Sequence, residues 1–128
     1  MLEGPVHHES VLVKEVLDAL ACRPNVQAVY LDCTVGMGGH SEAILNATIP
    51  YGRVIGIDRD EDALFIARNR LTPFRDRMTL CKGSFSELME IAKKLGVASV
   101  SGVLFDLGAS SMQFQSPERG FSFQSPGR

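Results

Sequence analysis

Three aspartates end apolar, β-prone runs, where carboxylates can bind a polar ligand. They are Asp32, Asp58 and Asp106. In an open α/β sheet the carboxyl ends of parallel strands line the ligand crevice, so we expect all three carboxylates to face one pocket. Carboxylates in that position can accept hydrogen bonds from ribose hydroxyls and attract a cationic ligand. For Asp58 we favour ribose binding over the alternative of capping the helix that begins near Asp60.

A glycine-rich loop follows Asp32 and precedes a helical pattern that begins at Ser41. It contains Gly36, Gly38 and Gly39, which let a backbone turn sharply or approach a ligand closely because they lack a Cβ. A dinucleotide site requires G-x-G-x-x-G, which this loop matches only in part. The acids would also repel a pyrophosphate, whereas they would attract a ligand with a sulfonium and an ammonium group. The residues therefore favour S-adenosylmethionine over a nicotinamide dinucleotide.

Alternating strands and helices must position these residues. Expected strands cover 28–33, 53–57, 78–81 and 102–107, and expected helices cover 10–21, 41–47 and 60–71. A fourth helix begins with the capping-box pair Ser84 and Glu87, ends at Gly96, and is expected to bury Phe85, Leu88, Met89, Ala92 and Leu95. Continuous apolar strands are typical of a parallel sheet covered on both faces, which predicts an α/β, Rossmann-like domain.

Composition restricts the function without choosing one. The 128 residues fit one domain, and 45% hydrophobic with 22% charged residues is ordinary for a soluble protein. No apolar run is long enough to span a membrane and no targeting pattern is present, so we expect an intracellular protein. Cys22, Cys33 and Cys81 lack a metal-binding spacing and are expected as free thiols. Because the formal charge is -2, local patches must bind any nucleic-acid partner.

Five motifs occur in the order known from one enzyme family. They are D-x-T-x-G-x-G-G-H-S from Asp32, I-D-R-D from Ile57, F-S from Phe85, D-L-G-x-S-S from Asp106 and E-R-G-F-S-F from Glu118. With the opening segment at residues 8–12, this pattern resembles the MraW-like family of S-adenosylmethionine-dependent methyltransferases. The resemblance implies a class I methyltransferase fold and methyl transfer to N4 of a cytidine in small-subunit ribosomal RNA. Bacterial members are cytoplasmic and eukaryotic ones mitochondrial.

The resemblance also implies which residues meet the cofactor and the RNA. The cofactor set is Asp32, Gly36, Gly38, Gly39, His40, Asp58, Phe85, Asp106 and Gln113. The RNA set is Ser110, Ser111 and Arg119, with the target cytidine unpaired or flipped out of its helix. Asp106 is also the catalytic candidate, because an oxygen acceptor can hold the target amine with its lone pair aimed at the methyl carbon.

Three of these residues have a second interpretation. The helical spacing of Phe85 is that of a core residue, whereas the motif favours a position in the cofactor pocket. His40 has the chemistry of a metal ligand or general base, but no second ligand is evident, so we expect a loop hydrogen-bonding residue and no metal. Arg119 fits an RNA phosphate and an ordinary solvated arginine equally well.

The family pattern ends after Phe123, where relatives continue into an inserted helical domain and further strands. We therefore expect residues 1–123 to form the N-terminal part of a class I methyltransferase domain, with a divergent tail at 124–128. The sheet would stop after its fourth strand, whose unpaired edge would favour self-association. Besides a methyltransferase, the sequence allows a non-catalytic module that binds the cofactor or a partner. A dehydrogenase that uses NAD is disfavoured by the loop and the acids.

Overall fold

Strands and helices alternate through the computed structural model, which describes residues 13–108, 111–114 and 121–122. A helix at residues 13–19 comes first. The elements after it are β1 (Val29–Asp32), α2 (Gly39–Ala47), β2 (Arg53–Asp58), α3 (Glu61–Arg70), η1 (Thr72–Phe74), β3 (Met78–Lys82), α4 (Phe85–Lys94), β4 (Ser99–Val100), β5 (Gly102–Gly108), β6 (Ser111–Phe114) and β7 (Phe121–Ser122). Their order confirms the expected α/β class.

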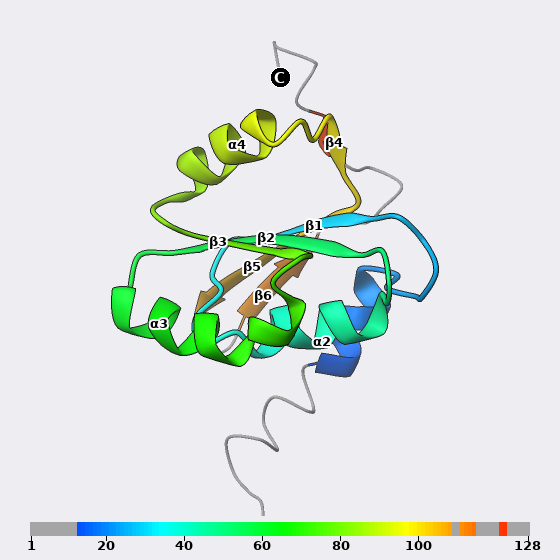
Figure 1. The fold of residues 1–128 in the computed structure, drawn as a ribbon, viewed down its shortest axis with the longest axis horizontal. Coiled ribbons are helices and arrows are strands. Elements are labelled where there is room, and N and C mark those ends of the chain that lie inside the picture. The colour runs from blue at the N-terminus through cyan, green and yellow to red at the C-terminus, as the bar shows by residue number, and fades with distance from the viewer. Residues whose placement is uncertain (1–12, 109–110, 115–120, 123–128) are drawn as a thin grey trace, which may run out of the picture.

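The main sheet has the order β3-β2-β1-β5-β6, and its first four strands are parallel (Figure 1). Because β1 lies between β2 and β5, the loops after these three strands emerge at the same end of the sheet. That end is where an open parallel sheet binds its ligands. A separate two-stranded sheet pairs β4 with β7.

Helices cover both faces of the sheet. Figure 1 shows α2, α3 and the helix at residues 13–19 on one side and α4 on the other. Successive strand residues point to opposite faces, so Tyr30 of β1 joins the core under α2 and α3, whereas Leu31 joins the core under α4. Both side chains are buried, with 3% and 1% of their surface exposed. The sheet therefore has an apolar layer on each side, as its continuous apolar strands predict.

Capping interactions set the helix ends as expected. Asp60 is the N-cap of α3, where its carboxylate accepts hydrogen bonds from the backbone N–H groups of Asp62 and Ala63 at 2.9 and 3.3 Å. The Glu87 carboxylate accepts a hydrogen bond from the backbone N–H of Ser84 at 2.6 Å, which begins α4. Gly96 follows the end of α4 with a φ of 81°, a conformation that glycine adopts without strain.

The prediction that the fourth strand has a free edge is wrong. Residues 111–114 form β6, which pairs antiparallel with β5 and places Gln113 opposite Phe105 and Met112 opposite Asp106. A strand edge carries unpaired N–H and C=O groups, and here a segment of the same chain satisfies them. Self-association through the edge of β5 therefore loses its basis, and the described sheet continues beyond its fourth strand.

Two residues of α4 are also less buried than the sequence predicts. Leu88 and Ala92 are fully buried, but Phe85 and Leu95 expose 39% and 44% of their surface. Leu95 is the C-cap of α4, where the helical spacing that aims side chains at the core has ended. Among the described residues no helix has the length and apolar character needed to cross a membrane.

Candidate cofactor-binding site

The glycine loop is attached to the strands on both sides of β1. The backbone N–H of Cys33 donates to the Leu104 carbonyl of β5 at 2.9 Å, and that of Val35 donates to the Ile57 carbonyl of β2 at 3.0 Å. A further bond from the N–H of Gly38 to the carbonyl of Val35, at 2.9 Å, closes the turn. The loop is therefore held at the carboxyl end of the sheet, where the sequence predicts it.

Positive φ angles explain two of the three glycines of the loop. Gly36 has a φ of 57° and Gly38, the N-cap of α2, a φ of 94°. A Cβ at Gly38 would lie 3.3 Å from Cδ1 of Leu71 and 3.4 Å from Cα of Ala67, so the start of α2 also packs closely against α3. Other residues would strain the backbone at both positions.

A glycine of β2, which the sequence reasoning did not select, supports the loop from the sheet. Val35 is 5% exposed, and a Cβ at Gly56 of β2 would lie only 2.2 Å from its Cγ2 atom. Gly56 thus leaves the space in which Val35 anchors the loop to the sheet. The sequence signal was a glycine inside an apolar strand, a pattern that often marks a close approach of another segment.

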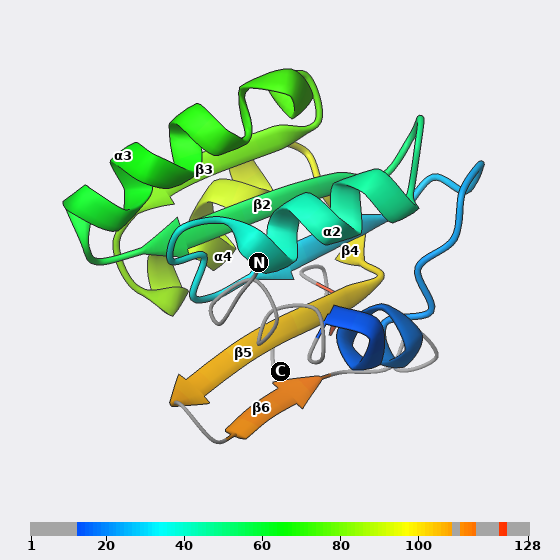
Figure 2. The ribbon, with the colours of Figure 1, turned by 90° about the horizontal axis from the view of Figure 1, so that it is seen from below.

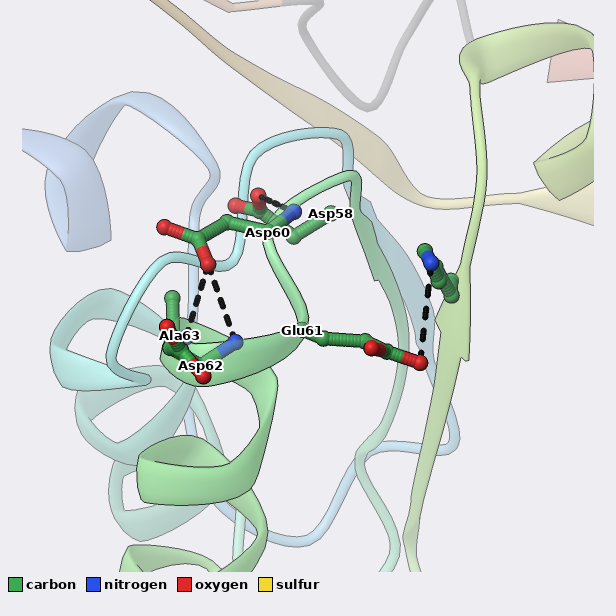
Figure 3. A network of polar contacts seen from close by, with 6 residues as sticks. Asp58, Asp60, Glu61, Asp62 and Ala63 are labelled. Carbon is green, nitrogen blue, oxygen red and sulfur yellow. Dashed lines mark hydrogen bonds and ion pairs between the residues drawn. The ribbon is translucent and has the colours of Figure 1, made fainter.

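Asp58 holds the loop by hydrogen bonding. Its Oδ2 atom accepts a hydrogen bond from the backbone N–H of Gly36 at 2.7 Å, and its Oδ1 atom accepts one from the N–H of Asp60 at 3.0 Å. Figure 3 shows Asp58 beside Asp60 at the start of α3. The helix N-cap is Asp60, so the capping alternative for Asp58 is wrong. The half-buried Asp58 instead joins the glycine loop to the turn before α3.

Asp32 is directed into the protein rather than into an open crevice, contrary to expectation. Its side chain is buried, with Oδ2 accepting a hydrogen bond from the Ser41 hydroxyl at 2.7 Å and Oδ1 one from the N–H of Thr34 at 3.2 Å. Burial raises the pKa of this carboxyl, and the bonds from Ser41 and Thr34 partly oppose that rise. Asp32 therefore acts on the site by fixing the loop to the start of α2.

His40 lies in the first turn of α2, because this helix begins at Gly39 rather than at residue 41. Its Nε2 atom is buried and has no hydrogen-bond partner among the described residues. Buried polar atoms in folded proteins are nearly always paired, so an atom of this kind beside the glycine loop is a candidate ligand contact. The described residues contain no cluster of side chains that would hold a metal ion.

Phe85 stands at the start of α4, just after β3. Its exposure of 39% contradicts the core interpretation and leaves part of the ring available for stacking. The ring contacts Phe105 of β5, with the centroids 5.5 Å apart and the planes tilted by 52°. Phe105 itself packs against the core under α4, as its place in an apolar strand predicts, but the sequence did not show its contact with Phe85.

The remaining predicted residues are placed by their backbones alone or lie outside the described residues. Asp106 of β5 is opposite Met112 of β6, and the next pair places Gln113 opposite Phe105. Ser111 begins β6 and is opposite Gly108. These strands bring the backbones of Asp106, Ser111 and Gln113 together. Ser110 and Arg119 lie outside the described residues.

The three cysteines do not belong to this site as nucleophiles. Cys22, Cys33 and Cys81 are free thiols, as the sequence predicts. Burial raises the pKa of the Cys33 thiol to about 12, and the nearby Asp32 adds to that rise. Burial also raises the pKa of Cys22 to about 11, against an opposing hydrogen bond with Tyr30. Protonated thiols are poor nucleophiles, so these residues are structural.

The model of the MraW methylase family matches residues 5–127. This chain belongs to the MraW methylase family. The match covers almost the whole chain and therefore includes every predicted site residue, from Asp32 to Arg119.

Relatives within the MraW methylase family include proteins named ribosomal RNA small subunit methyltransferase H. The one from Symbiobacterium thermophilum is 50% identical over 117 residues, which cover 91% of this chain and 36% of that relative. The one from Sorangium cellulosum is 52% identical over 120 residues, covering 94% and 37% respectively. The chain thus spans little more than a third of the length of these relatives.

Solved structures support the methyltransferase fold. A candidate rRNA methylase from Clostridium thermocellum aligns with a TM-score of 0.57 and 22% identity, over 79% of this chain and 56% of that one. TrmN from Thermus thermophilus aligns with a TM-score of 0.51 and 23% identity, over 58% of this chain and 22% of that one. At these identities the likeness concerns the fold. The Rossmann-like methyltransferase fold expected of this MraW family member is thereby confirmed.

Proposed function

We propose that this chain provides the cofactor-binding part of an S-adenosylmethionine-dependent methyltransferase acting on N4 of a cytidine in small-subunit ribosomal RNA. The observation that carries the proposal is the glycine loop, held at the carboxyl end of the sheet by the bond between Asp58 and Gly36. The names of the relatives supply the substrate class. Their bacterial origin favours the cytoplasm over a mitochondrion.

The described residues fit the proposed cofactor. His40 offers a buried Nε2 atom that lacks a protein partner, as expected of a group reserved for a polar ligand. Gly36, Gly38 and Gly39 would border the methionine part, Asp58 the ribose, and Phe85 the adenine through its exposed ring. Asp32 would contribute by holding the loop, since it is buried and accepts hydrogen bonds from Ser41 and Thr34. When bound, the cofactor supplies an electrophilic methyl group on a sulfonium.

Asp106 and Gln113 would act at the incoming base. A cytosine amine is a poor nucleophile because its lone pair is delocalised into the ring, so positioning must supply much of the catalysis. Asp106 lies on β5 and Gln113 on β6, and the antiparallel pairing of these two strands brings their backbones close together. We assign Asp106 the role of accepting a hydrogen bond from the amine, with Ser110, Ser111 and Arg119 contacting the RNA.

Methyl transfer with a defined product tests this function. The chain is incubated with radiolabelled cofactor and small-subunit rRNA, which is then digested to nucleosides. We expect the label in N4-methylcytidine, and we expect Asp106→Asn to remove it while the matched change Asp18→Asn, at an exposed position of the helix at residues 13–19, leaves it. Label in another nucleoside, or equal activity of the two variants, would contradict the proposal.

A non-catalytic module is the second candidate, and it predicts cofactor binding without labelled RNA. Such a module could also bind a partner protein through the edge of β5, but this is disfavoured because β6 already pairs with that edge.

A further inference from the structure

Positive charge is concentrated in one stretch of this mildly acidic chain. Residues 68–82 contain one acid, Asp76, and five cations, Arg68, Arg70, Arg75, Arg77 and Lys82, whereas the whole chain has a formal charge of -2. A local excess of this kind is the electrostatic footprint of a polyanion site. The stretch connects the end of α3 to the end of β3, the outermost strand of the sheet.

Three of the five cations already form hydrogen bonds or ion pairs within the protein. The Arg70 Nε atom donates to the Glu42 carboxylate at 2.8 Å. Arg77 donates to the carbonyls of Gly52 and Leu45 at 2.7 and 3.1 Å, which joins α2 to the start of β2. The Lys82 ammonium lies 3.5 Å from the carboxylate of Glu61 (Figure 3).

Arg68 and Arg75 differ from these three residues. Both are exposed, and within the described part of the chain neither forms an ion pair with a carboxylate. Arg75 donates from Nη1 to the carbonyl of Thr72 at 3.0 Å, while the Thr72 hydroxyl donates to the carbonyl of Arg68 at 2.9 Å. The two arginines are thus linked through Thr72 and retain donors for an external acceptor.

These arginines border a surface hollow of about 280 Å³. Its lining is Arg68, Leu71, Thr72, Arg75, Met78 and Leu80, which combines two arginines with three apolar residues. Phe65 of α3, one helical turn before Arg68, is 65% exposed on the same side of the helix. Cations, apolar side chains and an exposed aromatic ring together match the phosphates, riboses and bases of a single-stranded nucleic acid.

The hollow is separate from the cofactor site. Figure 2 shows α3 beside β3 at one edge of the sheet, with β5 and β6 at the other edge. Two strand spacings of about 4.8 Å separate β3 from β1, and three separate it from β5, where Asp106 lies. Leu71, Thr72 and Arg75 precede β3, so the hollow lies toward the amino end of that strand. The buried Leu71 also packs against Gly38 at the start of α2, so this side chain lies between the hollow and the glycine loop.

We propose that a single-stranded segment of the substrate RNA, beyond the target cytidine, lies in this hollow. Its phosphates bind Arg68 and Arg75, and a ribose or base rests on the partly buried Met78 and Leu80. The proposal rests on the proposed function, because it takes RNA as the substrate. It adds a second point of contact that holds the RNA while the target base occupies the cofactor pocket.

Fluorescence anisotropy of a labelled single-stranded oligonucleotide from small-subunit rRNA tests the contact. We expect Arg68→Ala with Arg75→Ala to weaken binding about tenfold and to reduce the slope of log affinity against log salt by about 1.4, since two phosphate contacts are lost. The matched control is Lys93→Ala with Lys94→Ala, which removes the same charge from exposed positions of α4 on the opposite face. We expect the control to change affinity by less than about twofold.

One further double variant and one titration make the result decisive. Arg68→Lys with Arg75→Lys retains both charges, so we expect it to keep the salt slope. S-adenosylhomocysteine binding, measured on every variant, is expected to stay unchanged.

If wild-type protein binds neither this compound nor RNA, the proposed function fails. If it binds both but the two alanine pairs lose RNA equally, or neither loses any, the proposed contact alone is overturned. Displacement of the RNA by an acidic peptide of equal charge and concentration would also overturn it.

Discussion

The carboxylate of Asp58 accepts a hydrogen bond from the backbone N–H of Gly36 at 2.7 Å, across 22 positions of sequence. This bond fixes the glycine loop after β1 to the end of β2. The other carboxylate oxygen of Asp58 accepts a hydrogen bond from the N–H of Asp60, so one side chain organises two backbone turns. A cofactor ribose placed at Asp58 would therefore meet a carboxylate whose position is already set by the protein.

Asp58→Asn separates this structural role from the charge of the carboxylate. The amide retains one oxygen acceptor, so we expect a loss of about 1 kcal/mol in the free energy of unfolding, whereas Asp58→Ala loses about 1.5–3 kcal/mol. Urea denaturation measures both. Equal stability of the three proteins would contradict the role of this bond in holding the loop.

Gly56→Ala is expected to displace the loop from the sheet. The new methyl group would overlap the Cγ2 atom of Val35, and overpacking of this kind costs about 1–3 kcal/mol. Adding Val35→Ala removes the overlapping atoms, so the double variant should recover part of the stability lost by Gly56→Ala. The test is a double-mutant cycle by denaturant unfolding, and strict additivity of the two changes would refute the contact.

The contribution of the buried Asp32 side chain to the stability of the protein should fall as pH rises above the ordinary pKa of an aspartate. Burial raises the pKa of Asp32 from its usual 3.8, so the folded state binds this proton more tightly than the unfolded state does. The stabilisation is complete below pH 3.8 and is lost as pH rises through the folded pKa. Asp32→Asn cannot lose a proton and should not show this fall.

Unfolding of both proteins at a series of pH values measures the difference. Ser41→Ala provides a second comparison, because it removes the hydroxyl that donates to Asp32 at 2.7 Å. Without this donor the buried carboxylate is less well paired, at a cost of about 1–3 kcal/mol that is greatest where Asp32 is ionised. Parallel pH profiles for wild type and Asp32→Asn would show that Asp32 is not the group responsible.

Phe85→Ala distinguishes the pocket from the core. A fully buried phenylalanine loses about 3–5 kcal/mol on truncation to alanine, whereas Phe85 is 39% exposed and should lose clearly less. We expect its main effect to be weaker binding of S-adenosylhomocysteine, with Phe105→Leu giving a smaller loss through the ring contact at 5.5 Å. Leu95→Ala, at a similarly exposed position of α4, is the matched control for stability.

The sequence predicted the elements better than the contacts between them. Strand and helix positions follow from apolar runs and capping residues, and Asp60, Ser84, Glu87 and Gly96 have the predicted roles. The strand β6 was missed because S-M-Q-F is too short to show a clear period. The inward orientation of Asp32 and the space that Gly56 leaves for Val35 depend on packing between segments. A single sequence does not show such pairings.

Calorimetric titration of S-adenosylhomocysteine into the chain and into Asp58→Ala tests the central claim most directly. Asp76→Ala is the matched control, since it removes an exposed carboxylate at the turn before β3. The account predicts saturable binding to wild type and to Asp76→Ala, and its loss in Asp58→Ala. A folded wild-type chain that binds none of the compound, or Asp58→Ala protein that binds it as tightly as wild type, would contradict the cofactor site described above.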